Sequence, residues 1–297
     1  MTFELFLQHL ANGISLGSLY ALIAIGYTMV YGILRLINFA HGDVVMLGAY
    51  AAFYGAALFL LPWYIAFPLA IIITAALGVI IERVAYKPLR EYPRINLFTA
   101  AVAVSFLIEN LGIVIFGGRP FAFTRPEFMD VNLSFGKTSI ISYTFIIIIT
   151  AGILFAILLY LVNKTKAGMA MRALSKDIET TGLVGVNTDR IIMFTFALGS
   201  ALAAAGGILW ATKFPQINPL MGVMPGLKAF IAAVLGGIGN IPGAMIGGFL
   251  LGISEILIVA FLPSLSGYRD AFAFAILILL LLFRPNGIMG EVQAEKV

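Results

Sequence analysis

The amino-acid sequence predicts an all-α polytopic membrane protein with eight or nine transmembrane helices. Three observations carry this prediction. Of the 297 residues, 61% are hydrophobic and only 11% are charged, whereas an ordinary soluble domain carries about 25% charged residues. The mean hydropathy of +1.05 is too high for a surface that faces water. The apolar residues also form long continuous runs, which favours helices over a membrane β-barrel.

The same composition excludes several classes of protein, namely soluble globular enzymes, disordered proteins and nucleic-acid-binding domains. The net charge of +4 does not alter this, because the basic residues are scattered between apolar runs and form no stripe. The chain has no cysteine, so it has no disulfide, no thiol catalysis and no cysteine-ligated metal. This composition fits a protein of the bacterial inner membrane.

A helix needs about 20 apolar residues to cross a bilayer. The candidate spans are residues 9–34, 44–61, 64–86, 97–117, 139–163, 191–212, 225–239, 243–262 and 269–284. The run 225–239 is short and interrupted by glycine, so the expected number of spans is eight or nine. No segment between the spans is long enough for a soluble domain, and we expect a single membrane domain over residues 1–297.

The distribution of Lys and Arg predicts the orientation, because cytoplasmic loops carry an excess of both. Twelve of them fall in one set of loops and six in the other. The richer set comprises residues 35–43, 83–96, 164–190, 240–242 and 284–297. We therefore expect the loop 164–190 and the C-terminus in the cytoplasm, with the N-terminus in the periplasm if there are nine spans. The first basic residue, Arg35, follows the first apolar run, so no cleavable signal peptide is expected.

Small residues recur at four-residue spacing within the spans. Such rows let helix backbones approach closely in lipid, where packing drives association, and they predict a tight bundle. The rows are Gly13 and Gly17; Gly48, Ala52 and Ala56; Gly199, Ala203 and Gly207; and Gly248 with Gly252.

Two segments, 36–43 and 236–243, interrupt the apolar sequence with polar or helix-breaking residues. Transporters often carry paired broken helices beside the solute route. We therefore expect Asn38, His41 and Asp43 from the first break, and Asn240 from the second, at the route or its gate. For the first three residues, a solvated cytoplasmic turn is an equal alternative.

Two acidic residues, Glu109 and Glu255, fall inside predicted spans. A charged side chain within the membrane is costly and marks a functional site by default. We expect them either to line the pathway or to be hydrogen-bonded to packing partners.

No catalytic residue, metal site or bound cofactor is predicted for this chain. Gly136, Lys137 and Thr138 look like the end of a phosphate-binding loop, but position 131 is Val131 where that motif needs glycine. Two histidines, of which one is His9, are too few for a histidine-rich metal site.

The loop 164–190 is expected to form a cytoplasmic amphipathic helix. Its small and apolar residues recur at three- and four-residue spacing: Ala170, Ala173, Leu174, Ile178 and Thr181. Gly182 or Gly185 would end the helix, and Asn187 and Asp189 would cap the next one. The exposed charges suit a docking element for a partner, and they are Arg172, Lys176, Asp177 and Glu179. The alternative is a helix that rests on lipid headgroups.

Together, four segments give a specific resemblance. They are Ile37–Asp43, the Arg172–Arg190 loop, the run Lys228–Ala244 and the motif Arg284–Gly287. In these residues the chain resembles the LivH-type membrane permease of bacterial branched-chain amino acid ABC importers, over almost its whole length.

The resemblance implies a division of labour. A LivM-type second permease would pair with this chain, and two cytoplasmic ATPases of LivG and LivF type would use ATP and Mg. A periplasmic binding protein would deliver leucine, isoleucine or valine. The loop 164–190 would be the coupling helix, although it lacks the usual Glu-Ala-Ala opening. The coupling residues would be Arg172, Asp177, Glu179, Gly185, Asn187 and Asp189.

Sister permeases carry urea, short amides or other amino acids, so the solute stays open. A second hypothesis is a proton-coupled secondary transporter that uses Glu109, Glu255, Asp43 or His41 as a relay. Only two ionisable groups lie well inside the spans, which is few for such a relay.

Overall fold

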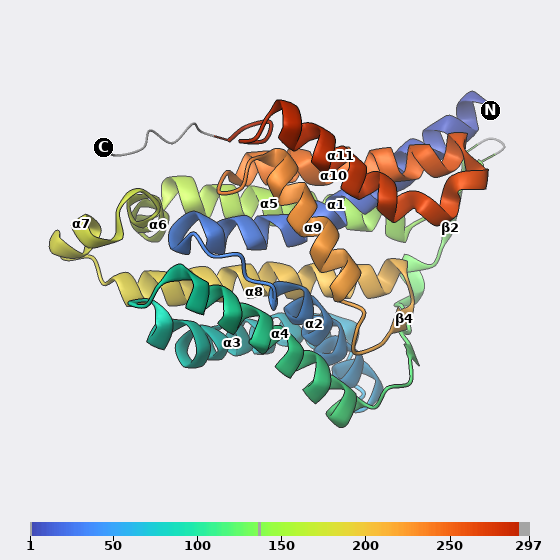
Figure 1. Cartoon of the computed structure of the whole chain (residues 1–297). Coiled ribbons are helices and arrows are strands. Elements are labelled where there is room, and N and C mark those ends of the chain that lie inside the picture. Colours follow the sequence, from blue (N-terminus) through green and yellow to red (C-terminus); the bar gives the residue numbers. More distant parts are fainter. Residues whose placement is uncertain (1, 136–137, 291–297) are drawn as a thin grey trace.

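The computed structural model describes residues 2–135 and 138–290, and most of them form long helices (Figure 1). The helices that match the predicted spans are α1 (Phe3–Leu34), α2 (His41–Ala57), α3 (Trp63–Ile81), α4 (Arg94–Phe116), α5 (Tyr143–Lys164), α8 (Thr188–Lys213), α9 (Val223–Gly236), α10 (Ile241–Phe261) and α11 (Arg269–Phe283). Within the described residues, seven helical segments are long and apolar enough to cross a membrane. The helical membrane fold is thus confirmed, with α2 and α9 as shorter helices.

The remaining elements are short. Two small helices, α6 (Lys166–Lys176) and α7 (Ile178–Leu183), join α5 to α8, and a π-helical turn, Glu82–Tyr86, follows α3. Strands β2 (Asn132–Phe135) and β3 (Thr138–Ile141) pair antiparallel, as do β1 (Phe121–Ala122) and β4 (Gln216–Ile217).

Several expected span boundaries were wrong: α1 starts at Phe3 and not at 9, and α2 ends at Ala57 and not at 61. Two others have clear local reasons. A helix was expected to start at residue 139, but α5 starts only at Tyr143. The β-branched residues Ile140 and Ile141 favour a strand and form β3, which pairs with β2. The span expected to end at 239 stops at Gly236, since Gly237 has a φ of +104° and leaves the helical conformation.

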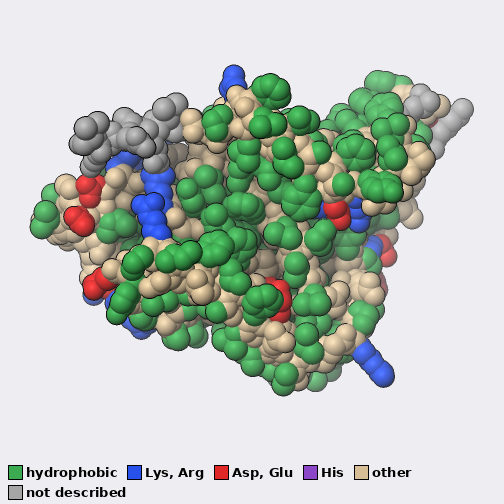
Figure 2. All heavy atoms as spheres, viewed as in Figure 1, with side chains coloured by type: hydrophobic (Ala, Val, Ile, Leu, Met, Phe, Trp, Pro, Cys, Tyr) green, Lys and Arg blue, Asp and Glu red, His purple; other side chains and the backbone are tan. Residues whose placement is uncertain are grey.

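Helix α1 is the centre of the bundle. Nearly all of its apolar stretch is buried, and it packs against α10, α8, α9 and α5. By contrast, only a small share of the residues of α3, α4, α5 and α11 is buried. Figure 2 shows hydrophobic side chains over much of the middle of one face. The outer helices therefore supply the lipid-facing surface, and α1 supplies the core.

The rows of small residues lie at the helix contacts, as predicted. A Cβ atom at Gly17 would lie 2.8 Å from the Cα of Phe249, and one at Gly248 would lie 2.5 Å from the nitrogen of Ala21. Farther along the same contact, Gly252 faces the backbone of Gly17. Helices α1 and α10 thus meet backbone to backbone, as glycine permits in lipid.

The bundle has two distinct ends (Figure 1). Helices α6 and α7 lie at one end, where the C-terminal end of α1 also lies. At the other end, Gln8 near the start of α1 donates from Nε2 to the carbonyl of Ser139 in β3, at 2.8 Å. The loop 164–190 therefore lies at the end opposite to the start of α1.

We predict that Gly248→Ala destabilises the protein by about 1–3 kcal/mol, because the new methyl group overpacks the α1–α10 contact. The matched control is Gly152→Ala in α5, where nothing lies within 4 Å of the added Cβ. The control should be neutral or slightly stabilising. Thermal unfolding of the detergent-solubilised protein measures both, and equal melting temperatures would contradict the packing role of Gly248.

Candidate functional site

The loop 164–190 folds as two helices, so the expectation of one continuous amphipathic helix was wrong. Helix α6 ends at Lys176, and Asp177 then takes an extended conformation with φ −159° and ψ 114°. Its side chain accepts a hydrogen bond from the Thr180 nitrogen at 3.1 Å and caps α7. An aspartate carboxylate that bonds its own backbone competes with helix continuation, which explains the break.

Helix α6 is fixed to the membrane bundle. Met171 and Leu174 are buried, and Gly168 contacts the carbonyls of Leu161 and Val162 at the end of α5. The guanidinium of Arg172 donates to the Val162 carbonyl. Arg172 was expected to be a docking charge, yet this hydrogen bond anchors α6 to its own chain.

Helix α7 and the residues after it protrude from the bundle (Figure 1). Glu179 is exposed, as expected. Leu183 is 88% exposed and Val184 is 75% exposed, and sequence analysis missed both. Their signal was an apolar pair directly before Gly185, whose φ of +87° confirms that the chain turns there. Exposed apolar residues beside a charged surface are typical of an interaction site.

Asn187 and Asp189, which were both expected to cap α8, have different roles in the structure. The side chain of Asn187 accepts from the Arg190 nitrogen at 3.0 Å and caps α8, as predicted. Asp189 does not cap. It forms ion pairs with Lys87 at 2.6 Å and Arg90 at 2.9 Å, because both cations lie in the turn that follows α3.

Arg90 also pairs with the buried carboxylate of Glu82. Burial lowers the pKa of Arg90, and the carboxylate of Asp189 opposes that shift. The end of the α6–α7 loop is thereby tied to the segment after α3 as well as to α8. Nothing in the local sequence pattern predicted this link, since Glu82 and Asp189 are far apart in the chain.

The first break, between α1 and α2, is buried. Asn38 is 4% exposed, His41 1% and Asp43 2%. Tyr86 donates to Asn38 at 2.7 Å, and Ser105 donates to Asp43 at 2.6 Å. The solvated-turn alternative is therefore wrong, since each group has a partner inside the protein.

His41 occupies a space made by glycine. Its Nε2 lies 3.2 Å from the carbonyl oxygen of Ile23, and its ring is 4.6 Å from the ring of Tyr27, centroid to centroid. A Cβ atom at Gly26 would collide with the imidazole. His41 thus fixes the start of α2 against the middle of α1.

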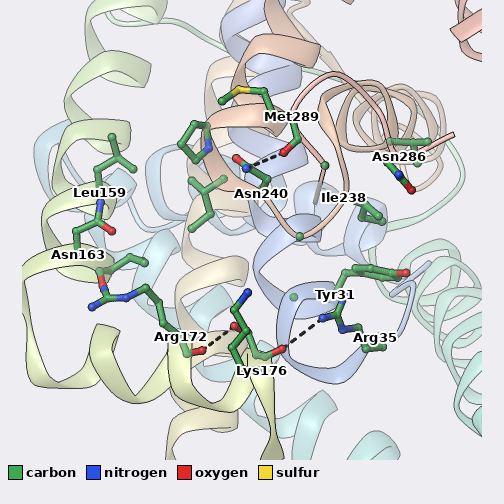
Figure 3. A pocket seen from close by; sticks show the side chains of 18 of the residues that line it. Tyr31, Arg35, Leu159, Asn163, Arg172, Lys176, Ile238, Asn240, Asn286 and Met289 are labelled. Atoms are coloured by element: carbon green, nitrogen blue, oxygen red, sulfur yellow. Dashed lines mark hydrogen bonds between the residues drawn. The ribbon is translucent and has the colours of Figure 1, made fainter. Parts of the chain in front are cut away.

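The second break, between α9 and α10, borders a cavity. Asn240 caps α10 by accepting from the Gly243 nitrogen at 2.9 Å, and its Nδ2 donates to the Met289 carbonyl at 3.0 Å. Figure 3 shows this second bond. The cavity is lined by Asn240 but by none of Asn38, His41 and Asp43. The structure therefore does not bring the two breaks into one site.

The two membrane carboxylates have different surroundings. Glu255 is 5% exposed and accepts from Tyr20 at 2.8 Å, and it pairs with Lys228 at 2.8 Å. Lys228, counted as a loop residue in the charge analysis, is instead buried on α9 and also pairs with Asp270 at 2.6 Å. Glu255 thus fits the alternative of a carboxylate held by packing partners.

Glu109 differs from Glu255, because it is half-buried on α4. No ion pair involves it within the part of the chain that the structure describes. Ser105 precedes it by one helical turn and so lies on the same face, which is the face that carries the bond to Asp43. Glu109 therefore lies on the side of α4 that faces Asp43 of α2.

Gly136, Lys137 and the C-terminal residues 291–297 lie outside the described residues. Among the residues that are described, no group of three or more His, Cys, Asp or Glu side chains could hold a metal ion.

Comparison with known proteins decides the family. The sequence model for the permease component of the branched-chain amino acid transport system matches residues 9–281. The chain belongs to this family. It is 44% identical over 308 residues to the high-affinity branched-chain amino acid transport system permease protein BraD of Pseudomonas aeruginosa, covering 98% of each chain. It is 43% identical to LivH of Escherichia coli K12, covering 99% of each.

More distant relatives share less. The ribose import permease protein RbsC of Haemophilus influenzae is 28% identical over 91% of this chain and 82% of its own. Among solved structures, PsaBC from Streptococcus pneumoniae in complex with Fab matches with a TM-score of 0.51 and 14% identity. That match covers 95% of this chain and 92% of the other. At this identity the likeness shows a shared fold alone.

We predict that Lys228→Met destabilises the protein by about 3–5 kcal/mol, because breaking a buried ion pair leaves its charge poorly compensated. The buried Glu255 and the nearby Asp270 would then keep only the exposed Arg269, whose Nε lies 3.7 Å from Glu255 and 3.9 Å from Asp270. The double variant Lys228→Met/Glu255→Gln should recover part of this loss, since the buried charge is then removed too. Denaturant-induced unfolding in detergent measures both.

The control for this prediction is Asp130→Asn, which breaks the pair of Arg125 with an aspartate whose side chain is 62% exposed. It should cost about 1 kcal/mol or less. If Lys228→Met cost no more than this control, the buried network would have no role in stability.

Proposed function

We propose that this chain is the membrane permease subunit of an ATP-binding-cassette importer that moves leucine, isoleucine and valine into the cytoplasm. The observation that carries the proposal is the identity of 43–44% to LivH and BraD over nearly the full length. Permeases for urea, short amides or other amino acids remain the alternative. The proton-relay hypothesis is weakened, because Lys228 neutralises Glu255.

The proposal includes partners that supply what this chain lacks. A periplasmic binding protein would deliver the solute, and a LivM-type permease would form the other half of the membrane unit. Two LivG/LivF-type ATPases would bind ATP and Mg and carry out hydrolysis, so this chain is a non-catalytic membrane subunit. The names of the relatives as transport system permease proteins support this arrangement.

We further propose that the end of the bundle with α6 and α7 faces the cytoplasm of a bacterial cell with an inner membrane. Support comes from the charge bias, because cytoplasmic loops are enriched in Lys and Arg. Residues 285–290 lie at this same end, beside Arg35 and Lys176. The C-terminus would then be cytoplasmic, and the start of α1, at the other end, periplasmic.

The loop 164–190 is proposed as the coupling element, with α7 docking in an ATPase. Glu179, Leu183 and Val184 form the exposed surface. Asp177 and Gly185 set the path of the chain on either side of α7, and Arg172, Asn187 and Asp189 fix the loop to the bundle. A push on α7 would therefore reach α5, α1 and α8, which are the helices that α6 contacts.

For the solute pathway we propose Glu109 and Asn240 as residues near the route. We propose that the α1–α2 break acts as a gate. The buried side chains that would keep its backbone in place are Asn38, His41 and Asp43. Glu255, paired with Lys228, would stabilise the helices beside the route.

Reconstitution tests the proposed function directly. We expect uptake of leucine into proteoliposomes only when the second permease, both ATPases, the binding protein and ATP are all present. A catalytically inactive ATPase serves as the matched control and should abolish uptake. Uptake by this chain alone, driven by a proton gradient, would contradict the proposal and restore the relay hypothesis.

For the coupling element we predict that Leu183→Asp lowers solute-stimulated ATP hydrolysis by about tenfold or more, as expected for loss of an apolar contact at the centre of an interface. Membrane insertion should be unchanged, since Leu183 is 88% exposed. Leu183→Met is the control and should keep most of the stimulation. ATPase assays of the assembled complex measure the effect.

Asp177 gives a second comparison within the same assay. Asp177→Asn keeps a good capping residue and should retain stimulation, whereas Asp177→Arg should lose it. A helix that rests on lipid would make Leu183→Asp weaken membrane attachment and leave stimulation intact. That result would rule out the coupling role.

A further inference from the structure

A cavity of about 820 Å³ lies at the end of the bundle that carries α6. Its walls come from five places in the chain: the ends of α1 and α5, helix α6, the break between α9 and α10, and residues 285–290 (Figure 3). This volume falls within the range of small-molecule sites. Neither the relatives nor the coupling proposal assigns it a ligand.

The lining is basic and polar. It includes three cations, Arg35, Arg172 and Lys176, and no Asp or Glu among the described residues. Asn163, Asn240 and Asn286 add side-chain amides that can donate. Figure 3 shows Arg35, Arg172 and Lys176 on one side of the cavity, with Asn240 and Asn286 across it. Such a lining favours an anion.

Helix α10 adds to the positive electrostatic potential in the cavity, because its first residues, Ile241 and Pro242, also line it. The start of a helix carries partial positive charge. Two of the three cations already bond to backbone carbonyls: Arg172 donates to Val162 at the end of α5, and Arg35 donates to Ser175 of α6 at 3.3 Å. Each of these bonds involves one nitrogen of the guanidinium, which carries further N–H donors.

The position of the cavity points to the nature of the anion. Helices α1 and α5 end at Leu34 and Lys164, and the cavity is formed at these ends. It therefore lies at the depth where membrane helices meet the headgroup layer. Basic pockets between membrane helices at this depth bind anionic lipid headgroups.

We propose that this cavity binds a phosphate group, supplied by an anionic phospholipid of the surrounding leaflet or by free inorganic phosphate. The bound phosphate would contact Arg35 of the α1 end, Arg172 and Lys176 of α6, and the start of α10. It would thus hold α6 in place through a ligand in addition to direct packing. Asn240, proposed above to lie near the solute route, and α6, part of the proposed coupling element, both line this cavity. Binding of a phosphate group there requires neither transport of a solute nor an ATPase, so it can be tested separately from the proposed function.

The test uses the full-length chain in detergent and native mass spectrometry, with either phosphatidylglycerol or phosphatidylcholine added. We expect retention of phosphatidylglycerol and little retention of phosphatidylcholine. The variant Arg35→Gln/Lys176→Gln should weaken retention by about tenfold, since each cation near an anionic surface contributes appreciably. The control Lys164→Gln/Arg190→Gln removes two exposed charges from the same end, outside the cavity, and should retain the lipid.

Two further arms separate the sources of the ligand. If millimolar inorganic phosphate displaces the lipid, the site takes free phosphate. If the lipid stays bound, its acyl chains contribute to binding. Both results support a phosphate site. A chain ended after Gly290 tests the carboxylates of the C-terminal tail, which follows a lining residue. Lipid retention only after this truncation would overturn the proposal in favour of the tail. Equal retention of both lipids, or equal loss in the control, would also overturn it.

Discussion

Close backbone contact between α1 and its neighbours is the interaction on which the rest of the structure depends. In lipid, burial of apolar side chains gives little driving force between helices, so close packing must supply it. Gly17 and Gly248 let α1 and α10 touch along their backbones, and Gly26 leaves room on α1 for the ring of His41. Helices α9, α8 and α5 then complete the shell around α1. A bulky residue at any of these glycines would push α1 away from α10 or α2 and so disturb the packing of the other helices around α1.

The lipid surroundings also require that polar groups inside the membrane find hydrogen-bond partners. Non-helical backbone and polar side chains at membrane depth are tolerated only where protein or water satisfies them. At the first break, Tyr86 and Ser105 satisfy Asn38 and Asp43. At the second break, Asn240 satisfies the start of α10 and reaches Met289. The first break is thus built into the packing beside α1, whereas the second, in which Gly239 and Pro242 are exposed, borders the cavity.

The sequence predicted the structure correctly where a single segment carries the signal. Every predicted span has a matching helix, the small residues pack as expected, and the cap at Asn187 follows from its local position. It failed where the outcome depends on a distant residue. The role of Asp189 is set by Lys87 and Arg90, and the burial of Lys228 follows from pairing with Glu255 and Asp270. The break at Asp177 was missed for another reason, because the helical periodicity concealed a capping residue.

In the coupling role proposed above, the two halves of the α6–α7 loop would meet opposite requirements of a mechanical link. A link must be stiff where it joins the moving part and accessible where it is pushed. Helix α6 meets the first requirement, because Gly168 and Arg172 seat it on α5 and Arg35 donates to the Ser175 carbonyl at its other end, at 3.3 Å. Helix α7 meets the second, with Leu183 and Val184 exposed beyond the break at Asp177. The break therefore separates an anchored helix from a protruding one, a division that a single continuous helix would not provide.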